Sequence, residues 1–171
     1  MRQEIKKMLP VMNKVIDQFP QYRFIICGVG SLPKSMYHSQ RAEIVIDKTY
    51  EILSIAKSAI VTSGTATLET ALWNVPQVVG YITGPMTYAI GSRLVDVKYF
   101  SLVNLILNRE VVLELLQSGC TPESIGSELQ TLTEDTPRRA SVLNGYKELR
   151  KILGEESVSR TTAGLMIKYL Q

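Results

Sequence analysis

The stretch from Ala59 to Pro76, AIVTSGTATLETALWNVP, constrains the fold of this chain more than any other. It opens with a short β-branched run, which favours a strand, and continues into a turn of small polar residues at 63–67. Three apolar residues then recur at helical spacing, Leu68, Ala71 and Leu72. Asn74 and Pro76 end the helix, because Asn tolerates the left-handed conformation and Pro cannot continue a helix. The pattern predicts a strand, a tight turn and a helix start.

The turn at 63–67 combines features of an anion-binding site. Unpaired N–H groups and the positive end of the dipole converge at a helix start, and Gly64 lets a ligand approach the main chain. Three hydroxyls are added by Ser63, Thr65 and Thr67. The alternative is an ordinary strand-to-helix turn with Ser63 or Thr65 as the N-cap. These residues alone leave both interpretations open.

Composition narrows the class of protein. The 171 residues correspond to about one domain, and 45% hydrophobic with 20% charged residues is typical of a globular fold. The net charge of +3 is small and the basic residues are scattered, which argues against nucleic-acid binding. Cys27 and Cys120 have neither disulfide-framework nor metal-ligand spacing, so we expect a reducing, cytoplasmic setting and no metal. His38, the only histidine, lies in a polar stretch and is expected at the surface.

Apolar runs alternate with helical patterns in the first half of the chain. Strands are expected at 22–27, 43–46, 59–62 and 77–81, and helices at 2–18 and 49–57. Such alternation favours an α/β fold, a parallel sheet with helices on both faces. Beyond residue 84 we expect only helices, at 85–95, 110–117, 122–132, 137–153 and 157–170. The expected organisation is one domain, 1–171, with an α/β core (1–84) and a mainly helical part (85–171).

Three other patterns are weaker. The Gly-Val-Gly-Ser turn at 28–31 lacks the third glycine of a dinucleotide fingerprint, and no P-loop lysine follows a glycine-rich loop. Residues 70–92 carry no charge, but glycines and prolines interrupt them, so a membrane span is not expected. Five apolar residues beside Arg93 and Lys98 form either core or a shallow membrane-contact patch: Met86, Tyr88, Ile90, Leu94 and Val95.

Several motifs, in unbroken order from residue 2 to about 125, resemble the lipid A disaccharide synthase family. The central one is Ser-Gly-Thr-Ala-Thr-Leu-Glu at 63–69, followed by Asn-Val-Pro at 74–76. Others are Pro-Met-Thr-Tyr at 85–88, Arg-Leu-Val at 93–95, Ser-Leu-Val-Asn-Leu at 101–105 and Arg-Glu-Val-Val-x-Glu-Leu-Leu-Gln at 109–117. Departures from the family pattern are Val103 for a proline, Asn108 for a glycine, and Met1 about where an arginine of the donor-phosphate loop belongs. Asn108 can take a positive φ, so that turn is expected to be unchanged.

The resemblance implies one half of a GT-B glycosyltransferase, with a Rossmann-like sheet followed by a helical C-terminal region. Enzymes of the family join UDP-2,3-diacylglucosamine to 2,3-diacylglucosamine 1-phosphate in lipid A biosynthesis, release UDP and invert the anomeric centre. This chain resembles only their C-terminal, donor-binding half. The acceptor-binding N-terminal domain and its catalytic acidic residues have no counterpart here, so no catalytic residue is expected in the chain. A cytoplasmic location, peripheral at the inner membrane, follows from the resemblance.

Seven residues are candidates for binding the nucleotide and its diphosphate: Ser63, Gly64, Thr65, Thr67, Glu69, Asn104 and Arg109. The turn would donate to the departing diphosphate and Arg109 would add positive charge, which stabilises charge that grows in the transition state. The carboxylate of Glu69 would accept from ribose hydroxyls, and the resemblance places Asn104 near the nucleotide. The alternative for Arg109 and Glu110 is a solvated helix-start pair. No cofactor and no metal are expected, since the chain has no Asp-x-Asp.

Two further functions stay open: a UDP-sugar-binding domain of another GT-B transferase or epimerase, and a catalytically empty nucleotide-binding or interaction module. Oligomeric state is a separate question. An apolar stripe on the last helices would lack the partner that an N-terminal domain supplies, which favours a homodimer. Its residues are Val142, Leu143, Tyr146, Leu149, Leu153, Leu165, Met166, Tyr169 and Leu170. In the alternative, these helices fold back on their own sheet and the chain is a monomer.

Overall fold

The computed structural model describes residues 2–82, 98–154, 163 and 166–169. The first half contains α1 (Arg2–Gln18), β1 (Ile25–Gly28), η1 (Lys34–Met36), β2 (Glu43–Ile46), α2 (Thr49–Leu53), β3 (Ala59–Val61), α3 (Gly64–Leu72) and β4 (Gln77–Tyr81). The second half contains α5 (Leu102–Leu107), β5 (Glu114–Leu116), η2 (Gln117–Gly119), α6 (Pro122–Thr133) and α7 (Pro137–Leu153). The order is that of an α/β, Rossmann-like fold, as expected, and is consistent with half of a GT-B enzyme.

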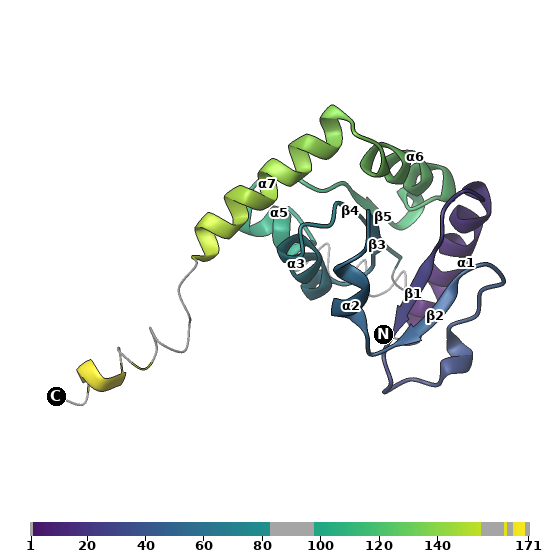
Figure 1. Ribbon diagram of the computed structural model, residues 1–171, viewed down its shortest axis with the longest axis horizontal. Helices are drawn as coiled ribbons and strands as arrows, with labels where there is room; N and C mark the ends of the chain where they lie inside the picture. Colours follow the sequence, from purple (N-terminus) through teal and green to yellow (C-terminus); the bar gives the residue numbers. More distant parts are fainter. Residues whose placement is uncertain (1, 83–97, 155–162, 164–165, 170–171) are drawn as a thin grey trace.

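The strands form two parallel sheets (Figure 1). In the smaller sheet β1 pairs with β2, with Ile25 opposite Glu43. In the larger sheet β4 lies in the middle, between β3 and β5, with Ala59 opposite Gln77 and Val79 opposite Glu114. The central strand is buried over its first four residues, whereas β1 and β2 are mostly half-buried. The larger sheet is therefore the centre of the core.

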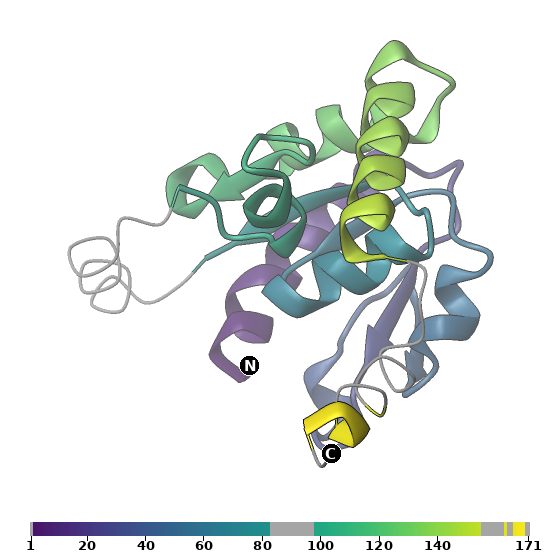
Figure 2. The same cartoon turned by 90° about the vertical axis from the view of Figure 1, so that its left-hand side faces the viewer.

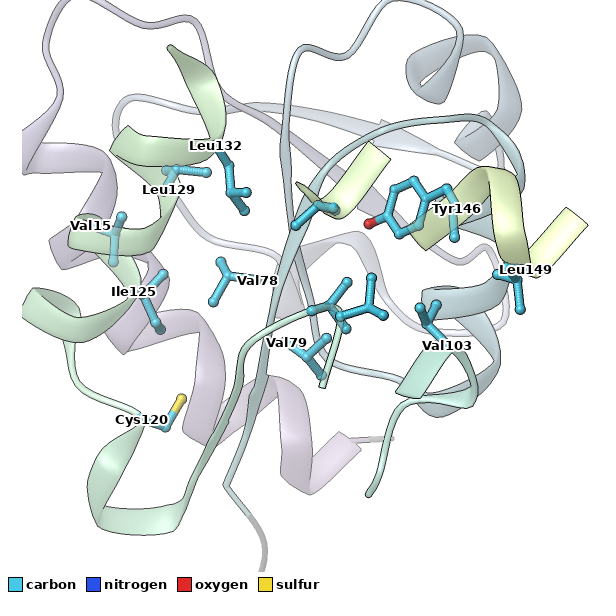
Figure 3. Close-up of a cluster of buried hydrophobic side chains, with 14 of the residues drawn as sticks. Val15, Val78, Val79, Val103, Cys120, Ile125, Leu129, Leu132, Tyr146 and Leu149 are labelled. Carbon is cyan, nitrogen blue, oxygen red and sulfur yellow. The ribbon is translucent and has the colours of Figure 1, made fainter. Parts of the chain in front are cut away.

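Helices cover both faces of the larger sheet. Contacts place α1 and α6 on one face, and α3, α5 and α7 pack together on the other, as Figures 1 and 2 show. Figure 3 shows the alternation of β4, with Val78 pointing toward Ile125 and Leu129 and Val79 pointing toward the side of Val103 and Tyr146. Because successive side chains of a strand face opposite ways, one strand joins the two apolar layers.

Most predicted elements are confirmed. The strands at 43–46 and 77–81 and the helix at 2–18 have the expected bounds, and α6 and α7 agree within one residue. The helix expected at 49–57 ends at Leu53: the amide of Ile55 donates to the carbonyl oxygen of Ile52 three residues back, at 3.1 Å, and the Ser54 hydroxyl donates to that of Glu51 at 2.7 Å. Asn74 and Asn108 both adopt the predicted left-handed conformation, with φ of 59° and 48°.

The helix predicted at 110–117 is wrong, as is the expectation that strands stop near residue 84. Residues 114–116 form β5, which pairs with the open edge of β4 and so completes the sheet from the second half of the chain. The carbonyl oxygen of Leu113, which in a helix would accept from the amide four residues later, accepts instead from the amide of Val79 at 2.9 Å. The amides of Val111 and Val112 donate to the side-chain oxygen of Asn104. Tertiary partners thus override the local helical spacing.

The apolar stripe of α7 is largely buried within the chain. Val142, Tyr146 and Leu149 are fully buried, while Leu153 is exposed, so for this helix the fold-back alternative holds. The helix predicted at 85–95, with its membrane-contact patch, lies outside the described residues, and so does most of 157–170. None of the described helices has the length and apolar character that crossing a membrane requires.

Candidate functional site

The turn between β3 and α3 presents unsatisfied donors to solvent. Ser63 is the N-cap residue, with extended φ and ψ of −141° and 137°, but its side chain makes no capping hydrogen bond. In the part of the chain that the structure describes, the amides of Gly64, Thr65 and Ala66 have no acceptor. Ser63, Gly64 and Thr65 are all exposed, and the Ser63 and Thr65 hydroxyls lie 3.4 Å apart. Three amides and two hydroxyls are therefore available to an anion.

Thr67 differs from its neighbours in the turn. Its side chain is fully buried, and its hydroxyl donates to the carbonyl oxygen of Gly64 at 2.5 Å. The same hydroxyl accepts from the amide of Leu102 at 3.2 Å. Thr67 therefore ties the first turn of α3 to the start of α5, and the structure turns its hydroxyl away from solvent.

Asn104 is fully buried and makes hydrogen bonds with both ends of its amide group. Its oxygen accepts from the amides of Val111 and Val112 at 2.8 and 3.0 Å. Its nitrogen donates to the carbonyl oxygen of Val112 at 2.8 Å and to the carboxylate of Glu114 at 2.7 Å. The side chain is thus occupied in holding the loop between α5 and β5, and any role toward a nucleotide would be exerted through that loop.

The two charged candidates differ in their side-chain contacts. Glu69 is exposed on α3 and makes no hydrogen bond or ion pair within the described residues. Arg109 follows the C-terminal end of α5 and forms an ion pair with Glu148 of α7 at 2.5 Å. The helix-start interpretation of Arg109 and Glu110 is wrong, since no helix begins there, but the guanidinium is about half exposed. The structure therefore keeps Glu69 beside the exposed turn and engages Arg109 with α7.

The glycine-rich turn after β1 already has internal partners. The amide of Val29 donates to the hydroxyl of Tyr37 at 3.0 Å, and that of Gly30 donates to the Asp47 carboxylate at 2.8 Å. A Cβ on Gly30 would stand 2.3 Å from an oxygen of that carboxylate, so a larger residue would have to displace the Asp47 side chain. Across the described ranges, His, Cys, Asp and Glu side chains do not gather in any group of three able to hold a metal ion.

Two polar features of the core escaped the sequence interpretation. Glu114 accepts hydrogen bonds from the segment that precedes α5, and its signals were the motif at 109–117 and a carboxylate inside the apolar run at 111–116. Gln77 begins β4 with a buried amide, which donates to the hydroxyl of Tyr146 at 3.1 Å and to the carbonyl oxygen of Thr67 at 2.9 Å. Burial raises the pKa of Tyr146 far above its usual value, although the contacts with Gln77 act in the opposite direction.

Comparisons of the sequence with known proteins identify the family of the chain. The sequence profile of the family described as lipid-A-disaccharide synthetase matches residues 2–167. A lipid-A-disaccharide synthase of Geobacter metallireducens is 31% identical to this chain, over 99% of the chain and 47% of the relative. Those of Sodalis glossinidius and Gloeothece citriformis are each 34% identical, over 93% and 99% of this chain and over 40% and 47% of the relatives. The chain thus spans less than half the length of these relatives, and it belongs to the lipid-A-disaccharide synthetase family.

Proposed function

We propose that this chain is the donor-binding part of a lipid A disaccharide synthase, an inverting glycosyltransferase that uses UDP-2,3-diacylglucosamine. The observation that carries the proposal is the exposed start of α3, where three amides have no acceptor in the described part of the chain and two hydroxyls lie exposed beside them. It follows strand β3, at the carboxyl edge of the parallel sheet, where α/β folds bind their ligands. The family membership supports a nucleotide-sugar as that ligand.

The chemistry of the transfer fits this turn. As the bond between sugar and UDP breaks, negative charge accumulates on the diphosphate, and preorganised amides at a helix start stabilise that charge. Glu69, exposed and without a partner among the described residues, is placed one turn into the same helix. We assign it the ribose hydroxyls, because a carboxylate accepts two hydrogen bonds from a vicinal diol.

The chain spans less than half the length of the relatives that it matches. In this proposal the acceptor, 2,3-diacylglucosamine 1-phosphate, and the catalytic acidic residues belong to an N-terminal domain. We therefore expect UDP binding but no disaccharide formation by the 171-residue chain. If the purified chain forms disaccharide from donor and acceptor, the assignment of the catalytic residues to an N-terminal domain is wrong.

Titration calorimetry with UDP, ADP and GDP tests the proposed ligand. We expect selective binding of UDP, and equal affinity for all three nucleotides would reject the uridine assignment. Glu69→Ala should weaken UDP binding about tenfold, since a hydrogen bond to a charged group contributes more than about 1.4 kcal/mol, and should leave binding of uracil unchanged. Glu51→Ala, another exposed helix carboxylate, is the matched control and should leave UDP binding unchanged.

The proposal also includes contact with the membrane surface and self-association through the end of the chain. Ile152 and Leu153, at the end of α7, and Met166, Ile167 and Tyr169 beyond it are exposed apolar or aromatic side chains. Such side chains gathered near one terminus favour a second copy as their partner. Light scattering at micromolar concentration should give about twice the monomer mass of 19.1 kDa. A clean monomer would remove the dimer from the proposal.

A further inference from the structure

We propose that Glu114 is a positioning residue for donor binding: its carboxylate holds the 100–104 segment against the exposed start of α3. The inference rests on the proposed function, because it assigns a second layer of residues to the same site. The motif at 109–117 includes this residue, but the sequence assigns it no role.

Four hydrogen bonds converge on this one carboxylate. One oxygen accepts from the amide of Phe100 at 2.7 Å. The other accepts from the amide and hydroxyl of Ser101, at 3.0 and 2.7 Å, and from the side-chain nitrogen of Asn104 at 2.7 Å. All four partners are donors, so only an ionised carboxylate satisfies them together.

The segment held in this way touches the candidate site directly. The carbonyl oxygen of Phe100 lies 3.5 Å from the place where a Cβ on Gly64 would stand. The amide of Leu102 donates to the Thr67 hydroxyl, which in turn donates to the carbonyl oxygen of Gly64. A displacement of residues 100–102 would therefore be transmitted to the turn that presents the unpaired amides.

The segment has two further contacts that do not depend on Glu114. The ring of Phe100 stacks on Tyr81 at the end of β4, with 6.4 Å between ring centroids. The Ser101 hydroxyl also accepts from the amide of Asn104 at 3.2 Å and caps α5. Loss of the Glu114 contacts should therefore loosen the segment without unfolding the sheet, which makes the inference testable by substitution.

Glu114→Gln is the decisive variant, because it keeps the size of the side chain and turns an acceptor into a donor that opposes a donor. In titration calorimetry of the 171-residue chain we expect UDP affinity to fall about tenfold and uridine affinity to change less than twofold. Uridine lacks the diphosphate that the α3 turn would bind, so a purely structural defect would weaken both ligands equally. Glu110→Gln, an exposed carboxamide change in the same loop, should leave both affinities unchanged.

The outcomes distinguish a failure of the proposed function from a failure of the positioning role of Glu114. If the wild-type chain fails to bind UDP, the proposed function is rejected. If the wild type binds UDP and Glu114→Gln binds it equally well, or loses UDP and uridine in parallel, the positioning role is rejected. Should Glu114→Gln fail to fold, Ser101→Ala replaces it, since it removes one donor to the carboxylate together with the side-chain cap of α5. That variant should weaken UDP about threefold and spare uridine, and an unchanged UDP affinity would reject the role.

Discussion

Two helix starts that meet in this structure are built from the same small polar residues and treat them in opposite ways. At the start of α3, Ser63 and Thr65 are exposed and three amides have no acceptor within the described residues. At the start of α5, Ser101 and Asn104 are fully buried, and each is hydrogen-bonded to Glu114. The comparison teaches that residue type does not separate a binding group from a structural one. The difference is whether the group already has a hydrogen-bond partner within the protein.

Asn104→Ala should have the largest effect on stability. It removes the acceptor of two buried amides and a donor to Glu114, and buried groups without partners cost about 1–3 kcal/mol each. We expect the free energy of unfolding to fall by about 3 kcal/mol in urea titrations. Asn144→Ala, on the exposed side of α7, is the control and should change it by less than about 0.5 kcal/mol. If the two substitutions lower the free energy of unfolding equally, the buried hydrogen bonds of Asn104 do not have the structural role assigned to them.

Tyr146→Phe tests the buried side of the comparison through pH. Burial raises the pKa of Tyr146, so the folded protein holds the phenol neutral while the unfolded chain ionises near pH 10. Its contribution to stability is therefore complete below about pH 10 and is lost as the pH rises further. The variant should be less stable by about 1 kcal/mol at pH 7, because the contact with Gln77 is lost.

Urea unfolding between about pH 7 and pH 11 provides the measurement. The wild type should lose stability above about pH 10 more steeply than Tyr146→Phe, so that the two curves converge. Lysines titrate in the same range in both proteins, which makes the variant the control for them. Parallel curves would show that Tyr146 is not the group responsible.

Gly64→Ala should have the smallest effect on stability and the clearest effect on binding. A Cβ at this position would meet only the Phe100 carbonyl oxygen, at an ordinary contact distance of 3.5 Å, and the backbone is helical. We expect a gain of about 0.5 kcal/mol in unfolding free energy, together with at least fivefold weaker UDP binding in calorimetry, because the methyl group blocks the main chain. A variant that is more stable and binds UDP as well as the wild type would show that the ligand does not approach this glycine.

The start of α3 could be predicted from the sequence because its signals are local. The strand, the turn and the stop at Asn74 all depend on neighbours within a few residues, and the φ of 59° at Asn74 agrees. The run at 110–117 could not be predicted in the same way. Its apolar spacing fits a helix, and only the edge of β4 and the side chain of Asn104 make residues 114–116 a strand.

For the same reason, the sequence locates the candidate site residues along the chain but does not tell which of their side chains are free. Ser63, Gly64 and Thr65 are exposed as a binding turn requires, whereas the side chains of Thr67 and Asn104 are occupied inside the protein. Motif resemblance gives position along the chain but not the direction in which a side chain points. Glu114 shows the converse: its neighbours in the sequence are apolar, and its partners lie ten or more residues away.

The packing of α1 against α6 has a consequence for synthesis of the protein. The helix α1 buries Met8 and Val15 in the core, yet the helix that it packs against most extensively spans Pro122–Thr133. At about 5–20 residues per second, a ribosome needs on the order of ten seconds to deliver that partner. During this interval only the part of α1 that contacts β4 can be covered, and the remainder of its apolar side is exposed to aggregation and to chaperones. The N-terminal segment therefore depends on the last third of the chain for its solubility as well as for its shape.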